Sequence, residues 1–175
     1  MDLINSIHHL FWQAPWAQSL GLVALIIGVS AFFQKDDQHL RYYLTVFTLC
    51  MAVHFFMLEQ YTSTCLALLG SVRNFVSSRT KNVWAMSLFI FIAVSISISN
   101  IDSLVHILPS VAIIAGSWGL FREKGIAMRV YMSCGTVCWL SHNLIVGSMG
   151  GILIESIFLI ANFKTMYSLY RESHV

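Results

Sequence analysis

Seven long apolar segments, separated by short polar or charged turns, make up most of the sequence. A helix that crosses a membrane needs about 20 mostly apolar residues, because each residue adds about 1.5 Å across a hydrocarbon core of about 30 Å. The segments that approach this length are 17–33, 42–58, 61–78, 83–99, 104–121, 128–146 and 151–169. The pattern therefore predicts an all-α membrane protein with seven transmembrane helices.

The composition excludes several other classes of protein. Hydrophobic residues make up 57% of the chain and charged residues only 10%, whereas soluble domains carry about 25% charged residues. The stretch 94–99 alternates Val or Ile with Ser like a strand, but an open strand in a bilayer leaves its backbone groups unpaired, so a helix is expected there.

Catalytic and metal-binding motifs are missing from the sequence. It contains no HExxH, no nucleophile elbow and no phosphate-binding loop, so we expect neither an enzyme nor a cofactor. All four cysteines lie inside apolar segments without metal-ligand spacing. They are Cys50, Cys65, Cys134 and Cys138. Cys134 and Cys138 are four apart on one helix face, and we expect this pair to be small packing residues and not a metal or redox site.

The basic residues predict how the chain crosses the membrane. Cytoplasmic loops are enriched in Lys and Arg, and with seven spans all ten Lys and Arg residues fall on the side of the C-terminus. The opposite side holds the N-terminus and the turns at Glu59, Asp102 and Gly147. The sequence therefore predicts a periplasmic N-terminus and a cytoplasmic C-terminus. Because topology explains every basic residue, nucleic acid is not expected as a partner.

The first residues are expected to lie on the membrane surface. A cleaved signal peptide begins with a positive region, but residues 1–18 contain no Lys or Arg. The aromatic side chains of Phe11, Trp12 and Trp16 are typical of the membrane interface. Residues 1–16 are therefore predicted to form an interfacial segment outside the cytosol.

The sequence repeats itself, without a gap, at an offset of 88 residues. The rare polar residues that coincide are Arg41 with Arg129, His54 with His142, and Asn74 with Asn162. Such residues are uncommon inside membranes, so their coincidence at one offset indicates two copies of one unit. An even number of helices separates the copies, so both enter the membrane in the same direction as parallel repeats.

This repeat predicts how the chain is organised. The two copies are residues 17–79 and 104–171, with a linker helix in 80–103 and a cytoplasmic tail in 172–175. Small residues recur as Ala-x3-Gly at 24–28 and 112–116. Such a pair puts small side chains on one helix face and permits close contact with a neighbouring helix.

Short stretches along the chain resemble a known family. They are Leu20 to Ala24, Phe32 to Lys35, Val53 to Leu58, Ser71 to Asn74, the Gly147-Ser148 pair and Glu155. Over roughly residues 17–171 the chain is similar to the YgjV-type family of bacterial inner-membrane proteins. Its three-plus-one-plus-three arrangement of helices also resembles the SWEET and PQ-loop transporter superfamily. The resemblance implies an inner-membrane location and a solute pathway between the repeats.

Six residues are candidates for binding a solute. Polar groups inside a membrane are costly and usually face the bundle interior, a cavity or a partner. The resemblance to SWEET-like carriers implies that paired asparagines bind substrate, and an aromatic ring can stack on a ligand. A histidine and a glutamate at similar depth can also form a hydrogen-bonded pair. The candidates are Asn74, Asn162, His54, His142, Glu155 and Trp139. The alternative is that these groups only hold neighbouring helices together.

Other polar and aromatic residues are expected to have topological roles. Arg73 and Lys164 are expected to extend to the cytosolic headgroups. Arg41 and Arg129 are expected to cap the second helix of each repeat from the cytosol. Trp84 and Trp118 suit the interfacial aromatic belt.

Two functions remain open from the sequence. The first is a small-solute transporter of SWEET-like architecture, whose substrate the sequence does not identify. The second is a non-transporting partner subunit, sensor or assembly factor, which is compatible with the short loops and with the absence of the helix-flexing prolines of sugar carriers. The expected partners are the lipid bilayer and a small polar solute, and a homo-oligomer stays open.

Overall fold

The computed structural model describes residues 12, 14–31, 37–98 and 104–172. These residues form seven helices and no strand. The helices are α2 (Pro15–Ala31), α3 (Asp37–Met57), α4 (Tyr61–Arg79), α5 (Val83–Ile98), α6 (Leu104–Arg122), α7 (Gly125–Val146) and α8 (Met149–Glu172). Each coincides with one predicted segment, the largest difference being the start of α3 at residue 37 instead of 42. The all-α prediction is confirmed, including the helical conformation of residues 94–98.

Some predicted features lie outside the described residues. Of the N-terminal interfacial segment, residues 1–11 and 13 are not described, and neither are Lys35 and the tail residues 173–175. The described tryptophans of that segment, Trp12 and Trp16, are both exposed.

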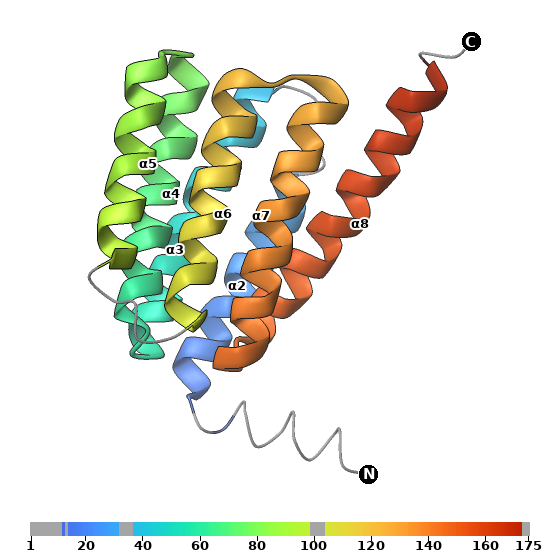
Figure 1. Cartoon of the computed structure of the whole chain (residues 1–175). Helices are drawn as coiled ribbons and strands as arrows, with labels where there is room; N and C mark the ends of the chain where they lie inside the picture. Colours follow the sequence, from blue (N-terminus) through green and yellow to red (C-terminus); the bar gives the residue numbers. More distant parts are fainter. Residues whose placement is uncertain (1–11, 13, 32–36, 99–103, 173–175) are drawn as a thin grey trace.

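The helices run alternately up and down as one bundle (Figure 1). Consecutive helices pack against each other from α2 to α4 and from α6 to α8, and two further contacts join α2 to α8 and α4 to α6. These six helices therefore form a closed ring. Helix α5 lies outside the ring, packed against α4 and α6. The C-terminal half of α8 leans away from its neighbours (Figure 1).

Small residues allow close approach where the two ends of the ring meet. A Cβ atom at Gly150 of α8 would overlap the backbone of Gly21 in α2, and one at Gly28 would lie 2.8 Å from Ile154. On the other side of the ring, a Cβ at Gly70 of α4 would lie 3.0 Å from Ile113 of α6. In lipid, where water does not drive helices together, such close van der Waals packing holds a bundle.

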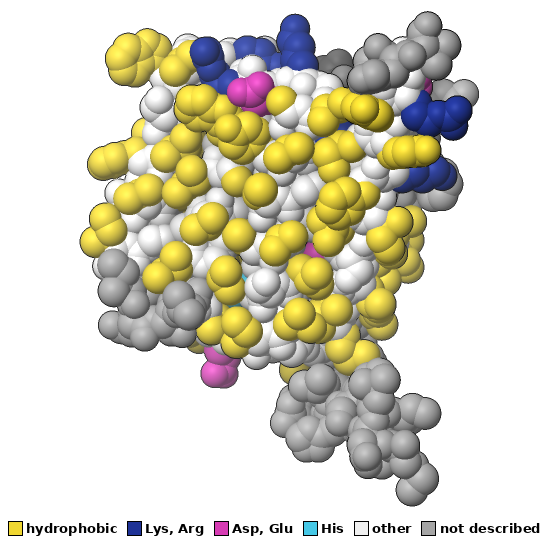
Figure 2. Space-filling view, turned by 45° about the vertical axis from the view of Figure 1, so that its right-hand side comes forward, with side chains coloured by type: hydrophobic (Ala, Val, Ile, Leu, Met, Phe, Trp, Pro, Cys, Tyr) yellow, Lys and Arg dark blue, Asp and Glu magenta, His cyan; other side chains and the backbone are white. Residues whose placement is uncertain are grey.

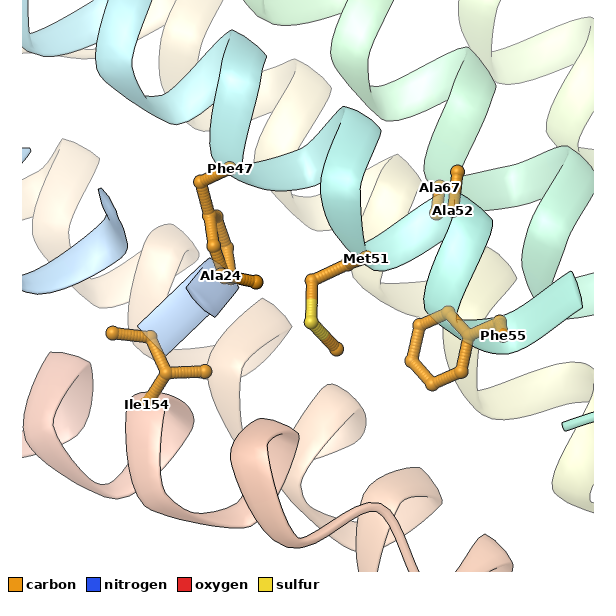
Figure 3. Packing of buried hydrophobic residues seen from close by; sticks show 7 residues of the cluster. All are labelled: Ala24, Phe47, Met51, Ala52, Phe55, Ala67 and Ile154. Atoms are coloured by element: carbon orange, nitrogen blue, oxygen red, sulfur yellow. The ribbon is translucent and has the colours of Figure 1, made fainter. Parts of the chain in front are cut away.

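The largest apolar cluster lies where α2, α3, α4 and α8 come together (Figure 3). Its buried members are Ala24, Phe47, Met51, Ala52, Phe55, Ala67 and Ile154. The predicted small-residue faces take part in such packing, because Ala24 is fully buried and Ala112 is 3% exposed.

The outer surface carries many large hydrophobic side chains. Trp84, Phe91 and Ile160 are each more than 65% exposed. Figure 2 shows one face on which hydrophobic side chains cover the middle and Lys and Arg gather near the upper end. By length and hydropathy, α8 alone among the described helices meets a strict criterion for a membrane span, while four shorter apolar helices fall below its length.

The turns after α3 and α7 share one backbone geometry. Glu59 and Gly147 both have positive φ, at 59° and 70°. In each turn the next amide reaches back five residues, from Gln60 to the Phe55 carbonyl and from Ser148 to the Asn143 carbonyl, at 2.9 Å in both cases. This is the Schellman ending of a helix. Glu59 and Gly147 are 88 residues apart.

Candidate functional site

A cavity of about 110 Å³ lies inside the ring of six helices. Residues of α3, α4, α6, α7 and α8 line it, so the N-terminal and C-terminal halves of the chain both contribute. Its polar lining consists of Thr48, Arg73, Asn74, Thr136, Asn143 and Glu155. A cavity with a few polar groups among apolar ones is the usual form of a small-molecule site.

Aromatic side chains form one wall of the cavity. Phe47, Met51 and Phe55 follow one another on α3 at a spacing of four residues, which places them on one helix face (Figure 3). The ring of Phe55 stacks on Trp139 of α7 at a centroid distance of 5.5 Å and an interplanar angle of 11°. Phe158 of α8 meets Phe47 edge-on at 5.4 Å. The wall therefore joins three helices from both halves.

The guanidinium of Arg73 points into the bundle. Its Nη1 donates to the carbonyl of Ile113 on α6 at 3.3 Å, and its Nη2 donates to Oδ1 of Asn74 at 2.9 Å. Its Nε is buried and has no hydrogen-bond partner among the described residues. Gly116 makes room for this side chain, since a Cβ there would collide with Nη1. The expectation that Arg73 extends to the headgroups is therefore wrong.

Glu155 brings a carboxyl group to the same cavity. Its side chain is 7% exposed, and the hydroxyl of Thr136 hydrogen-bonds to it. Glu155 lies six residues into α8 and Arg73 twelve residues into α4, and both helices begin at the same end of the bundle. At about 1.5 Å per residue, the two positions differ by about 9 Å along the helix axes. No ion pair joins these two side chains in the described part of the chain.

Two asparagines complete the polar lining. Asn74 donates from Nδ2 to the hydroxyl of Thr48 at 3.2 Å while its oxygen accepts from Arg73. Asn143 is 1% exposed, and its Oδ1 accepts no hydrogen bond from the described residues. This oxygen packs against Gly151 at the start of α8, where a Cβ atom would lie 2.3 Å from it.

Of the six predicted solute-binding residues, Asn74, Glu155 and Trp139 line the cavity, whereas His54, His142 and Asn162 do not. His54 bonds through Nδ1 to the Ala17 carbonyl at 2.7 Å and through Nε2 to Ser148 at 2.8 Å. His142 bonds through Nδ1 to the Val105 carbonyl at 3.0 Å and through Nε2 to Ser63 at 2.9 Å. The proposed hydrogen bond between His142 and Glu155 is not formed.

Asn162 and the two expected capping arginines tie helices together within each half. Arg129 of α7 donates to Oδ1 of Asn162 on α8 at 3.1 Å. Arg41 of α3 donates to the carbonyl of Ser77 on α4. Each arginine therefore binds the following helix, a contact that the expected capping role does not include.

Of the six polar lining residues, four were not predicted to be part of a site, namely Thr48, Arg73, Thr136 and Asn143. Thr48 and Thr136 coincide at the 88-residue offset. Treating every polar residue that recurs at this offset as a candidate would have included both threonines. Asn143 follows His142 directly and has no such match, because the residue 88 positions before it is Phe55. Only the rotation of α7 in the bundle places Asn143 at the cavity.

Comparison with known proteins identifies the family. A family model described as a bacterial inner membrane protein, Imp-YgjV, matches residues 15–173. The chain is 35% identical over 159 residues to "Inner membrane protein YgjV" of Escherichia coli (strain K12), an alignment that covers 90% of this chain and 87% of that protein. No solved structure matches the chain significantly. The chain therefore belongs to the YgjV family of bacterial inner membrane proteins.

Proposed function

We propose that this protein is a small-solute carrier of the inner membrane that binds its substrate in the cavity inside the helix ring. The observation that carries the proposal is the lining of that cavity. Polar and aromatic side chains from both halves of the chain converge on one cavity. Membrane carriers bind their solutes at such a place, between two structural repeats and near the middle of the bilayer.

The proposal includes a three-plus-one-plus-three arrangement of seven membrane-spanning helices. Helices α2 to α4 and α6 to α8 are the two parallel repeats, and α5 is the linker, which agrees with its place outside the ring. The hydrogen bonds of His54 to Ala17 and of His142 to Val105 support this arrangement. They are equivalent bonds, because His142 lies 88 residues after His54 and Val105 lies 88 residues after Ala17. The N-terminus is periplasmic and the C-terminus cytoplasmic in this arrangement.

The alternative is a non-transporting partner subunit, sensor or assembly factor. The observation that favours it is the outward lean of α8, because this helix carries large exposed side chains, among them Phe163, Tyr167 and Tyr170. Lipid covers such side chains equally well. We therefore keep the carrier as the proposed function, with no chemical reaction assigned to the cavity.

The test combines binding and flux. The purified protein is screened for thermal stabilisation by amino acids, sugars, nucleosides and vitamins, since a ligand that binds only the folded state raises its stability. Each compound that binds is then tested for uptake into proteoliposomes. A cavity variant, Thr136→Val, should weaken both. The matched control is Thr165→Val, whose hydroxyl bonds to the Ala161 carbonyl within α8.

A compound that stabilises the protein and enters vesicles in a Thr136-dependent manner supports the carrier. Binding without uptake favours a sensor. Stabilisation by no compound in the screen counts against a solute site and favours a subunit or assembly factor.

A further inference from the structure

We infer that the cavity takes a small zwitterionic solute, whose carboxylate binds Arg73 and whose ammonium group binds Glu155. This inference rests on the proposed function and names its substrate class. It starts from the two ionisable side chains of opposite type that line one cavity without contacting each other.

Neither ionisable side chain has a counter-ion within the described residues. Arg73 donates only to a backbone carbonyl and to an amide oxygen, and Glu155 is joined to a threonine hydroxyl. Burying a charge away from water is costly unless an opposite charge and hydrogen bonds compensate it. A solute with one charge compensates one end of the cavity and leaves the other unpaired. A solute with both charges compensates both ends at once.

The Arg73 end has the geometry that a carboxylate requires. A guanidinium can donate two parallel hydrogen bonds to the two oxygens of a carboxylate. The Nε of Arg73 is buried without a partner, so it can donate one of them. The neighbouring Asn74 holds Nη2 in place through its 2.9 Å hydrogen bond. This end therefore offers donors and suits the anionic part of the solute.

The Glu155 end offers acceptors. The carboxyl group of Glu155 belongs to a residue that lines the cavity. An ammonium group has three donors and no acceptor, so it matches a set of oxygens. The two residues are offset by about 9 Å along the helix axes, and the inferred solute spans the space between their charged groups.

The apolar side chains of the cavity wall favour a solute whose uncharged part is apolar. Met51, Phe55, Met132 and Trp139 line the cavity, whereas hydroxyl groups come only from Thr48 and Thr136 among the described lining residues. A sugar needs many more hydrogen-bond partners to replace its water. The volume of about 110 Å³ is smaller than the 300–1,000 Å³ of pockets for drug-sized ligands. A neutral amino acid with a small apolar side chain fits these conditions.

The experiment compares each zwitterion with analogues that lack one charge. Binding of neutral amino acids from glycine to phenylalanine is measured by calorimetry on the full-length protein in detergent. The tightest ligand is then compared with its decarboxylated and deaminated analogues, which for L-valine are isobutylamine and 3-methylbutanoate. We expect each analogue to bind about 10- to 100-fold more weakly, because each loses a charge-assisted hydrogen bond.

Two variants connect each charge of the solute to one residue. In Arg73→Gln, the amino acid and its amine analogue should bind equally, and in Glu155→Gln the amino acid and its acid analogue should bind equally. Glu155→Gln is nearly isosteric, so it tests the inference even if Arg73→Gln does not fold. The controls are Lys164→Gln and Glu172→Gln, which remove exposed charges of α8 outside the cavity and should leave affinity unchanged.

Three results would overturn the inference. One is equal binding of an amino acid and both of its analogues to the unchanged protein, and another is an equal loss of affinity in the control variants. The third is Thr136-dependent binding of a sugar or nucleoside without binding of any amino acid. That result would refute the zwitterionic substrate class but would leave the proposal of a carrier intact. If no compound binds, both the carrier and the zwitterionic substrate are refuted.

Discussion

The Nε2 atom of His54 lies 2.8 Å from the hydroxyl oxygen of Ser148, and this hydrogen bond joins α3 to the turn that precedes α8. The second histidine, His142 of α7, makes the corresponding bond across the ring to Ser63 of α4 at 2.9 Å. Both histidines are fully buried. The two halves of the chain are therefore joined by two buried histidine–serine bonds, one in each direction.

We predict that His54→Ala and His142→Ala each lower the free energy of unfolding by about 2 kcal/mol. Each change removes a hydrogen bond between helices and leaves a cavity. Solute affinity should change little in either variant, because neither histidine lines the cavity. The measurement is unfolding in mixed detergent micelles, with solute binding determined on the same samples.

A double-mutant cycle of His54→Ala with Ser148→Ala isolates the bond itself. The expected coupling is about 1 kcal/mol, as for other hydrogen bonds between membrane helices. Additive losses in the cycle would show that the bond contributes nothing. A loss of solute binding without a loss of stability would instead indicate that the histidines take part in solute binding.

We predict that Glu59→Gly stabilises the protein by about 1 kcal/mol. Glu59 has a φ of 59° in the turn after α3, a conformation that costs a residue with a Cβ about this much and that glycine adopts freely. The matched turn after α7 already has Gly147 at this place. The measurement is the melting temperature in detergent, and the control is Glu59→Gln, which removes the charge but keeps the Cβ. Equal stabilisation by both variants would attribute the effect to charge.

We predict different outcomes when two glycines of the ring are replaced by alanine. Gly150→Ala should destabilise the protein by about 2–3 kcal/mol, because its Cβ meets the rigid backbone of Gly21. Gly116→Ala meets the guanidinium of Arg73, which is the end of a flexible side chain. It should cost about 1 kcal/mol or less but reduce the affinity for solutes with a carboxylate. Melting temperatures and calorimetry on both variants distinguish these effects, and the reverse order would show that α2 and α8 are less closely packed.

We predict that Glu59 faces the periplasm and Lys124 the cytoplasm. Both residues are exposed in turns at opposite ends of the bundle. A variant without the four native cysteines serves as the background for Glu59→Cys and Lys124→Cys. A membrane-impermeant maleimide should label the first in intact spheroplasts and the second only after lysis. Labelling in the opposite order would invert the orientation.

The sequence by itself determined the helices. In a membrane, an apolar run of about 20 residues can pair its backbone hydrogen-bonding groups within itself only as a helix. Each of the seven runs forms a helix in the structure. It also showed the 88-residue relation that joins His54 to His142. These conclusions depend on composition along the chain, which folding does not change.

Only the tertiary structure decided which polar groups share the cavity. A soluble helix marks its buried face with apolar residues, but these helices also carry large apolar residues on their outer faces, so apolar residues do not show which way each one is turned. The rotation of α4 brings Arg73 inward, and the rotations of α7 and α8 bring Asn143 and Glu155 to the same space. The histidines, equally polar and equally buried, were turned toward neighbouring helices instead. Packing of small residues between helices sets these rotations, and that packing exists only in the assembled bundle.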